Sequence, residues 1–142
     1  MSKIWLNATH KPWLIGIFLL ALYPALVLGY VWYHCFISEF KYGRHGSLDA
    51  YRHTLASAVV AYTLSPVAVE LFTNISEASA GPSDLMDKHN NRIGSNIGLH
   101  AQAFAEINVD VIQAVRNGAI KTTNPNQITW MPTLWWEKGL FW

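Results

Sequence analysis

The chain has 142 residues, a formal net charge of +1, 51% hydrophobic residues and only 13% charged residues. Soluble domains carry about 25% charged residues, so this composition favours a membrane-associated protein with one modest domain. The balanced charge argues against nucleic acid as a partner, because duplex binding needs a patch of Lys and Arg that neutralises several phosphates. The single cysteine, Cys35, excludes an internal disulfide and a thiolate metal cluster.

An uncharged apolar run lies close to the N-terminus. Residues 13–33 read WLIGIFLLALYPALVLGYVWY, and about 21 residues at 1.5 Å per residue are enough to cross a hydrocarbon core of ~30 Å. Trp13 at one end and Tyr33 at the other are typical interfacial anchors. A cleaved secretory signal is the alternative, but the run ends in bulky residues and lacks a small-x-small cleavage site. We therefore predict a single-pass membrane anchor in residues 1–38, with the lipid bilayer as a partner.

The chain after the anchor shows helical periodicity. Residues 39–47 mix charges with two glycines and are typical of a linker. Apolar spacing then predicts an all-α domain of about four helices in residues 48–120. The expected helices cover residues 48–64, 66–77, 83 to about 104, and 106–117. Gly94 and Gly98 are expected to be weak points of the third helix.

Capping residues support these helix boundaries. Ser47 and Ser83 are expected N-caps, and Ser65 is an expected N-cap followed by proline at the first helical position. Gly118 suits the position after the last helix. A second membrane span over residues 54–72 is the alternative to the first two helices. Flanking charges and the Ser-Pro pair within that stretch disfavour it.

The C-terminal tail, residues 121–142, carries two prolines and four tryptophans and is expected to be largely irregular. Such aromatic side chains are typical of protein interfaces and of membrane head-group regions. The tail aromatics expected to be exposed are Trp130, Trp135, Trp136, Phe141 and Trp142. We therefore predict that the tail docks to a larger membrane protein complex or contacts lipid head groups.

Polar side chains gather on two of the expected helices. Asp49, Arg52 and His53 are spaced i, i+3 and i+4, so they project from one face of the first helix. On the third helix, Asp87 and His89 lie next to a pair of asparagines. An aspartate one turn from a histidine can fix its tautomer and raise its basicity, as a general base or a metal ligand requires. We expect the two helices to bring Asp49, His53, Asp87 and His89 into one cleft.

These two segments resemble the signature of a known family. D-A-Y-R-H over residues 49–53 and D-K-H-N-N-R-I-G over residues 87–94 look like the paired D-A-[FY]-R-H and D-x-H-N-N-x-x-G motifs of uncharacterised bacterial envelope and secreted proteins. The resemblance implies that Glu77 is the counterpart of an acidic residue between the motifs, although Ser76 stands where the family usually has a histidine. It implies no established activity. With basic residues before the apolar run, we expect a bacterial inner-membrane protein with a periplasmic domain.

The polar residues allow two interpretations. In the first, the protein is a hydrolase for a lipid or cell-wall substrate, and a general base or a divalent metal, zinc or manganese, activates a water. The candidate catalytic residues are Asp49, Arg52, His53, Asn90 and Asn91. The candidate metal ligands are His53, Glu77, Asp87 and His89. In the second, a non-catalytic accessory subunit of a membrane or envelope complex uses the same residues as a buried hydrogen-bonded network.

Overall fold

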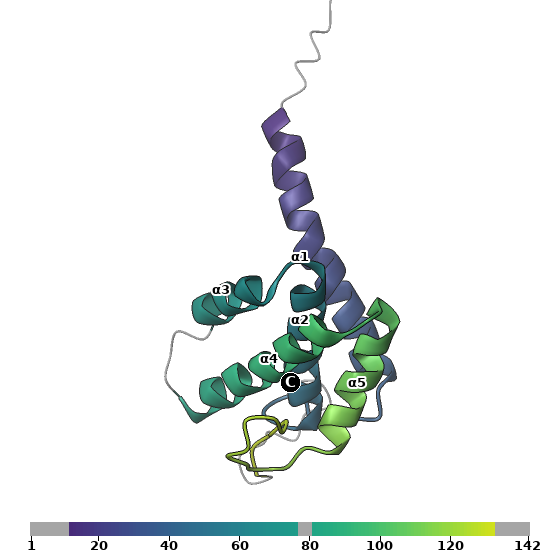
Figure 1. The fold of residues 1–142 in the computed structure, drawn as a ribbon. Helices are drawn as coiled ribbons and strands as arrows, with labels where there is room; N and C mark the ends of the chain where they lie inside the picture. Colours follow the sequence, from purple (N-terminus) through teal and green to yellow (C-terminus); the bar gives the residue numbers. More distant parts are fainter. Residues whose placement is uncertain (1–11, 77–80, 133–142) are drawn as a thin grey trace, which may run out of the picture.

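The chain folds into helices. A computed structural model describes residues 12–76 and 81–132, and the regular elements in these ranges are five helices (Figure 1). They are α1 Pro12–Ile37, α2 Ser47–Thr63, α3 Pro66–Ser76, α4 Pro82–His100 and α5 Phe104–Arg116. The all-α prediction, with one apolar N-terminal helix and about four further helices, is confirmed. Residues 121–132 of the expected tail contain no helix, and residues 133–142 lie outside the described ranges.

α1 has two parts with different surroundings. Over Ile15–Ile37 the helix is long and apolar enough to cross a membrane, and its N-terminal part stands clear of the other helices (Figure 1). Its C-terminal part packs against α2, where Val31 and Cys35 are buried in the core. The hydroxyl oxygens of Tyr23 and Thr63 lie 2.6 Å apart between the same two helices. The expected anchor is therefore also a core helix of the domain.

A folded loop turns the chain back after α1. Residues 38–46 include Tyr42 and His45 in the left-handed conformation, with φ values of 66° and 58°. Non-glycine residues adopt this conformation mostly in turns. The backbone N–H of Leu48 donates to the carbonyl of Lys41 at 3.1 Å, which closes the reversal. As a result, α2 runs antiparallel to α1.

The helix ends differ in part from the capping predictions. Ser65 is confirmed as a cap, since its hydroxyl oxygen accepts a hydrogen bond from the backbone N–H three residues later at 3.3 Å. Ser47 is not an N-cap, because the preceding glycine occupies that position and the Ser47 hydroxyl donates to the carbonyl of Lys41. The prediction for Ser83 is also wrong, because Pro82 already begins α4.

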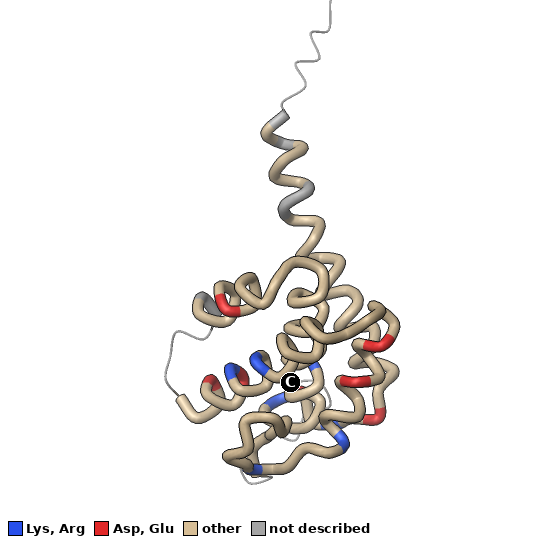
Figure 2. The backbone as a smooth tube through the Cα atoms, viewed as in Figure 1, with Lys and Arg blue, Asp and Glu red and all other residues tan. Residues whose placement is uncertain are grey.

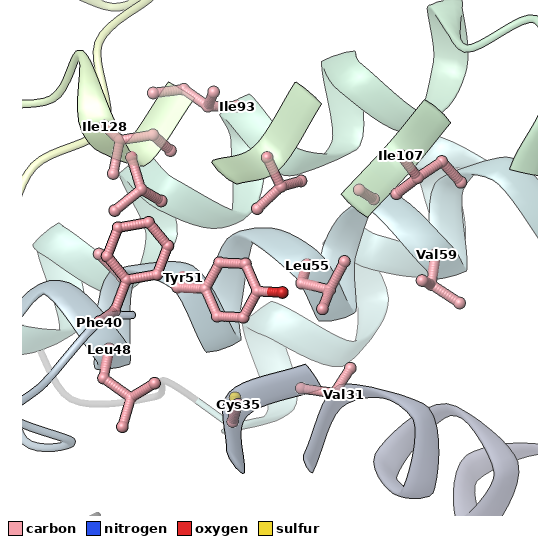
Figure 3. Packing of buried hydrophobic residues seen from close by; sticks show 14 residues of the cluster. Val31, Cys35, Phe40, Leu48, Tyr51, Leu55, Val59, Ile93, Ile107 and Ile128 are labelled. Carbon is pink, nitrogen blue, oxygen red and sulfur yellow. The ribbon is translucent and has the colours of Figure 1, made fainter. Parts of the chain in front are cut away.

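One apolar core joins α1, α2, α4 and α5 to the C-terminal segment, residues 117–132 (Figure 3). Tyr51 of α2 lies in the middle of this core, and its hydroxyl donates to the side chain of Asn108 on α5. The polar atom of the buried ring is thus paired. Ile128 is fully buried and Trp130 packs partly buried against the core. The expectation that Trp130 is exposed is therefore wrong, and the other tail aromatics lie outside the described residues.

α2 and α4 approach each other closely. A Cβ atom built at Gly94 would overlap the carbonyl oxygen of Thr54, and one at Gly98 would overlap the carbonyl oxygen of Ala58. Both pairs are spaced by four residues, so the contact follows one face of each helix. The two glycines were expected to be weak points of α4. They set the distance between the two helix backbones instead.

Replacing Gly94 with alanine is predicted to destabilise the fold. The added methyl group has to displace the backbone of α2, which costs about 1–3 kcal/mol. Gly29→Ala in α1 is the matched control, because a Cβ atom there meets nothing within 4 Å, and alanine is preferred over glycine inside a helix by roughly 0.5–1 kcal/mol. Thermal unfolding in detergent should show a lower Tm for G94A only. A Tm of G94A equal to that of the wild type would contradict the close contact.

Candidate functional site

Three titratable side chains meet where α2 and α4 touch. The Nε2 atom of His53 is 3.6 Å from Oδ1 of Asp49 on the same helix and 3.6 Å from Oδ2 of Asp87 on α4. One possible ligand atom from each of the three residues lies within 4.8 Å of the other two. We refer to Asp49, His53 and Asp87 as the Asp–His cluster. The structure therefore brings together three of the four side chains that were expected to share a cleft.

Asp49 is the most buried member of the Asp–His cluster. The residue is only 3% exposed, and its carboxylate accepts hydrogen bonds from the backbone N–H of His45 at 2.7 Å and from the guanidinium of Arg52. The Arg52 guanidinium also lies over the ring of Trp32 in α1, 5.6 Å from its centroid. A buried carboxylate needs such partners to offset its loss of water. Arg52 and the His45 backbone thus fix the position of the Asp49 carboxylate.

The surroundings of His53 favour its neutral form. Burial lowers the pKa of His53 below its usual value, and the nearby carboxylate of Asp49 opposes this shift. Neutral imidazole is the form that binds a metal or accepts a proton. The side chains of His53 and Asp87 remain 25% and 14% exposed. The Asp–His cluster is therefore partly accessible to solvent.

Asn91 links the Asp–His cluster to its neighbours. Its side chain hydrogen-bonds to His53, and its Oδ1 atom accepts a hydrogen bond from the hydroxyl of Ser57 at 2.8 Å. Its side-chain nitrogen donates to the hydroxyl oxygen of Thr73 on α3 at 3.3 Å. The buried amide of Asn91 therefore holds His53 in place and connects three helices.

His89 and Asn90 face the C-terminal segment. The Nε2 atom of His89 lies 2.6 Å from the carbonyl oxygen of Gln127, and His89 lines a separate cavity of about 570 Å³ with residues of that segment. The buried amide of Asn90 donates to the carbonyl of Thr129 at 2.7 Å and accepts from the backbone N–H of the same residue at 3.0 Å. The expectation that His89 shares a cleft with His53 is wrong. His89 is two positions from the aspartate that meets His53, and such residues point about 200° apart on a helix.

A largely apolar cavity of about 330 Å³ opens beside the Asp–His cluster, between α1, α2, α3 and α4. His53 and Asn91 form its polar end. Its apolar wall includes Val27 and Leu28 of α1, Val60 of α2, and Val69 and Phe72 of α3. The sequence gives no signal for this cavity, because its walls come from four helices that are separate along the chain.

Part of the site remains a prediction. Glu77 lies outside the described residues, so its expected role as a ligand has no structural counterpart. Comparisons of the chain with protein-family models, with curated proteins and with solved structures found no match. The chemistry is therefore inferred from the Asp–His cluster and the cavity beside it.

Asn90→Ala is predicted to destabilise the fold through the C-terminal segment. The substitution leaves the part-buried N–H and carbonyl of Thr129 without their partner, and each hydrogen bond lost from such a group costs about 0.5–1.5 kcal/mol. Asn96→Ala is the matched control, because Asn96 lies on the exposed face of the same helix. Urea unfolding should show lower stability for N90A and little change for N96A. If N90A is as stable as the wild type, Asn90 does not fasten the segment.

Proposed function

We propose that the protein is a membrane-anchored hydrolase that uses a divalent metal held by Asp49, His53 and Asp87. The observation that supports this most is the approach of two carboxylates and one imidazole, from two helices, to within 4.8 Å of one another. Carboxylate oxygens combined with an imidazole nitrogen suit zinc or manganese. Three protein ligands leave a coordination position for water, as in catalytic zinc sites.

The charges of the Asp–His cluster favour a cation. Two carboxylates lie next to His53, whose lowered pKa keeps the ring neutral and its lone pair available. A divalent ion held by Asp49, His53 and Asp87 would lower the pKa of a bound water and would so supply a nucleophile for hydrolysis. In this proposal Arg52 positions Asp49 and Asn91 positions His53. Both are positioning residues.

The proposed location follows from α1. The length and apolar composition of Ile15–Ile37 support a single crossing of a membrane. Basic residues before the helix favour a cytoplasmic N-terminus and a periplasmic domain. Together with the family resemblance, this orientation leads us to propose the bacterial inner membrane as the location. At this location, the substrate class that we propose is a lipid or a cell-wall component.

Asp87→Asn is predicted to weaken metal binding. The substitution removes one negative charge and keeps the size of the side chain, so the affinity for Zn²⁺ or Mn²⁺ should fall by at least about tenfold. Asp110→Asn on the exposed face of α5 is the matched control. Calorimetric titration and metal analysis of the full chain in detergent should give one ion per chain for the wild type and D110N. Absence of a stoichiometric ion in the wild type would reject the metal site.

A second candidate function is a non-catalytic accessory subunit. One observation favours it: the Asp49 carboxylate already accepts hydrogen bonds from Arg52 and from the His45 backbone. A buried network satisfied in this way can stabilise a fold without any substrate. In this alternative the Trp-rich C-terminal tail binds the larger membrane complex, and the Asp–His cluster serves stability alone.

His53→Ala separates the two candidates. For a hydrolase, the variant keeps its Tm and loses at least about 100-fold in metal-dependent hydrolysis of p-nitrophenyl butyrate or bis(p-nitrophenyl) phosphate. If the Asp–His cluster is only a structural network, the Tm of H53A falls, and the wild type shows no metal-dependent hydrolysis of either compound. His100→Ala, at the exposed end of α4, is the control for general effects of removing an imidazole. We expect the first result.

A further inference from the structure

The cavity beside the Asp–His cluster has one polar end and one apolar end. His53 and Asn91 mark the polar end, where Asn91 also bonds to Ser57. Along α2 the cavity extends from His53 to Val60, which is seven residues or about 10 Å of helix. At this end the cavity is lined by Val60 and by Tyr23, whose hydroxyl is paired with Thr63. The cavity thus has the polarity of a small amphiphile, with a polar group at one end and an apolar path leading away from it.

The apolar end of the cavity lies toward the projecting part of α1. α1 and α2 are antiparallel, since Tyr23 bonds to Thr63 while the ring of Trp32 lies against Arg52. The direction from the Asp–His cluster to the apolar end is therefore the direction in which α1 leaves the domain (Figure 1). An elongated molecule in the cavity would lie along α1.

This direction agrees with the polarity profile of a bilayer. In the proposed crossing, which begins near Trp13 and ends near Tyr33, the α1 wall of the cavity at residues 23–28 lies at the level of the hydrocarbon core. Trp32 and Arg52, residue types that suit a membrane interface, lie beside the Asp–His cluster. The polar end of the cavity is therefore at the level of the lipid head groups.

The outer surface beside the cavity is also apolar. Val67, Leu71 and Phe72 of α3 are each more than half exposed, at 63%, 60% and 53%, as is Leu64 just before the helix, at 55%. Glu70 is the one charged residue in the sequence of α3. Figure 2 shows most charged residues on α4, α5 and the loops, away from the projecting part of α1. On the α3 side, an apolar chain can therefore approach the cavity from the bilayer without passing a cluster of charges.

We propose that this cavity binds one acyl chain of a membrane amphiphile, with the chain along α1 and the head group at His53 and Asn91. Its volume of about 330 Å³ is at the lower end of ligand pockets, ~300–1,000 Å³, which suits one chain. The assignment rests on the proposed function, because it names the substrate class of the Asp–His cluster. For an ester, the water oxygen bonds to the carbonyl carbon, the bond from that carbon to the alcohol oxygen breaks, and the alcohol oxygen takes up a proton from the water.

Photoaffinity labelling of the full chain tests this assignment. The probe is a single-chain phosphocholine amphiphile with a diazirine in its acyl chain, added to nanodiscs of phosphatidylcholine and phosphatidylglycerol. Mass spectrometry should find labels at Val27, Val60 and Val69 that saturate with probe and disappear with unlabelled amphiphile. Phe18 and Leu26, which are exposed on α1, report ordinary lipid contact. Labels confined to such exposed residues, or cavity labels that do not saturate, would overturn the assignment.

A cavity-filling substitution gives a second test. Ala56 lines the cavity on α2, so Ala56→Phe should reduce saturable labelling by at least about tenfold. Ala105→Phe adds the same ring on the exposed face of α5 and should label like the wild type. Circular dichroism establishes that each variant is folded. Unchanged labelling in folded A56F contradicts the assignment, and if A56F does not fold, the competition experiment on the wild type decides.

Zinc titration distinguishes failure of this assignment from failure of the proposed hydrolase. Asp87 does not line the cavity, so zinc binding at the Asp–His cluster and labelling of the apolar wall are separate readouts. Stoichiometric zinc binding without saturable labelling rejects the acyl-chain site and keeps the metal site. Saturable labelling without binding of zinc or manganese supports the acyl-chain site and rejects the metal-assisted reaction.

Discussion

The close contact between α2 and α4 is the constraint on which the rest of the structure depends. Because Gly94 and Gly98 have no side chains, the backbone of α4 lies directly against backbone carbonyls of α2. The short distance between the helices allows Asp87 to reach His53 and allows the amide of Asn91 to bond to α2. The separation of packed helices, usually 8–10 Å, depends on the side chains at the contact, and glycine allows a close approach. Packing and the candidate site therefore have one common cause.

Asn90 and Asn91 are neighbours in sequence and face different parts of the molecule. Asn90 pairs with both backbone groups of Thr129, as a neighbouring strand would, and so fastens the C-terminal segment whose Ile128 fills the core. Asn91 contacts His53 and lines the apolar cavity. The two asparagines form one motif in the sequence, but Asn90 stabilises the fold and Asn91 belongs to the candidate site. A change at either position needs a measurement of stability and a measurement of ligand binding before a role can be assigned.

The helices could be predicted from the apolar periodicity, and helical spacing places Asp49, Arg52 and His53 on one face of α2. The meeting of His53 with Asp87 was expected because both belong to polar clusters on otherwise apolar helices. The position of His89 could have been predicted as well, since an offset of two residues from Asp87 places it on another face. The four-residue spacing of Gly94 and Gly98 indicates close packing against another helix, and our prediction of weak points there is wrong. The core position of Ile128 and the apolar cavity could not be predicted. Both depend on how segments distant in the chain meet, and local periodicity contains no such information.

α1 passes without interruption from its projecting part into the core, where Val31 and Cys35 are buried. A domain on a flexible tether samples many heights and angles above a membrane. This domain cannot do so while it stays folded, because swinging away from α1 would expose those two side chains. If α1 crosses a bilayer, the Asp–His cluster is therefore held at one fixed height and orientation relative to the membrane surface.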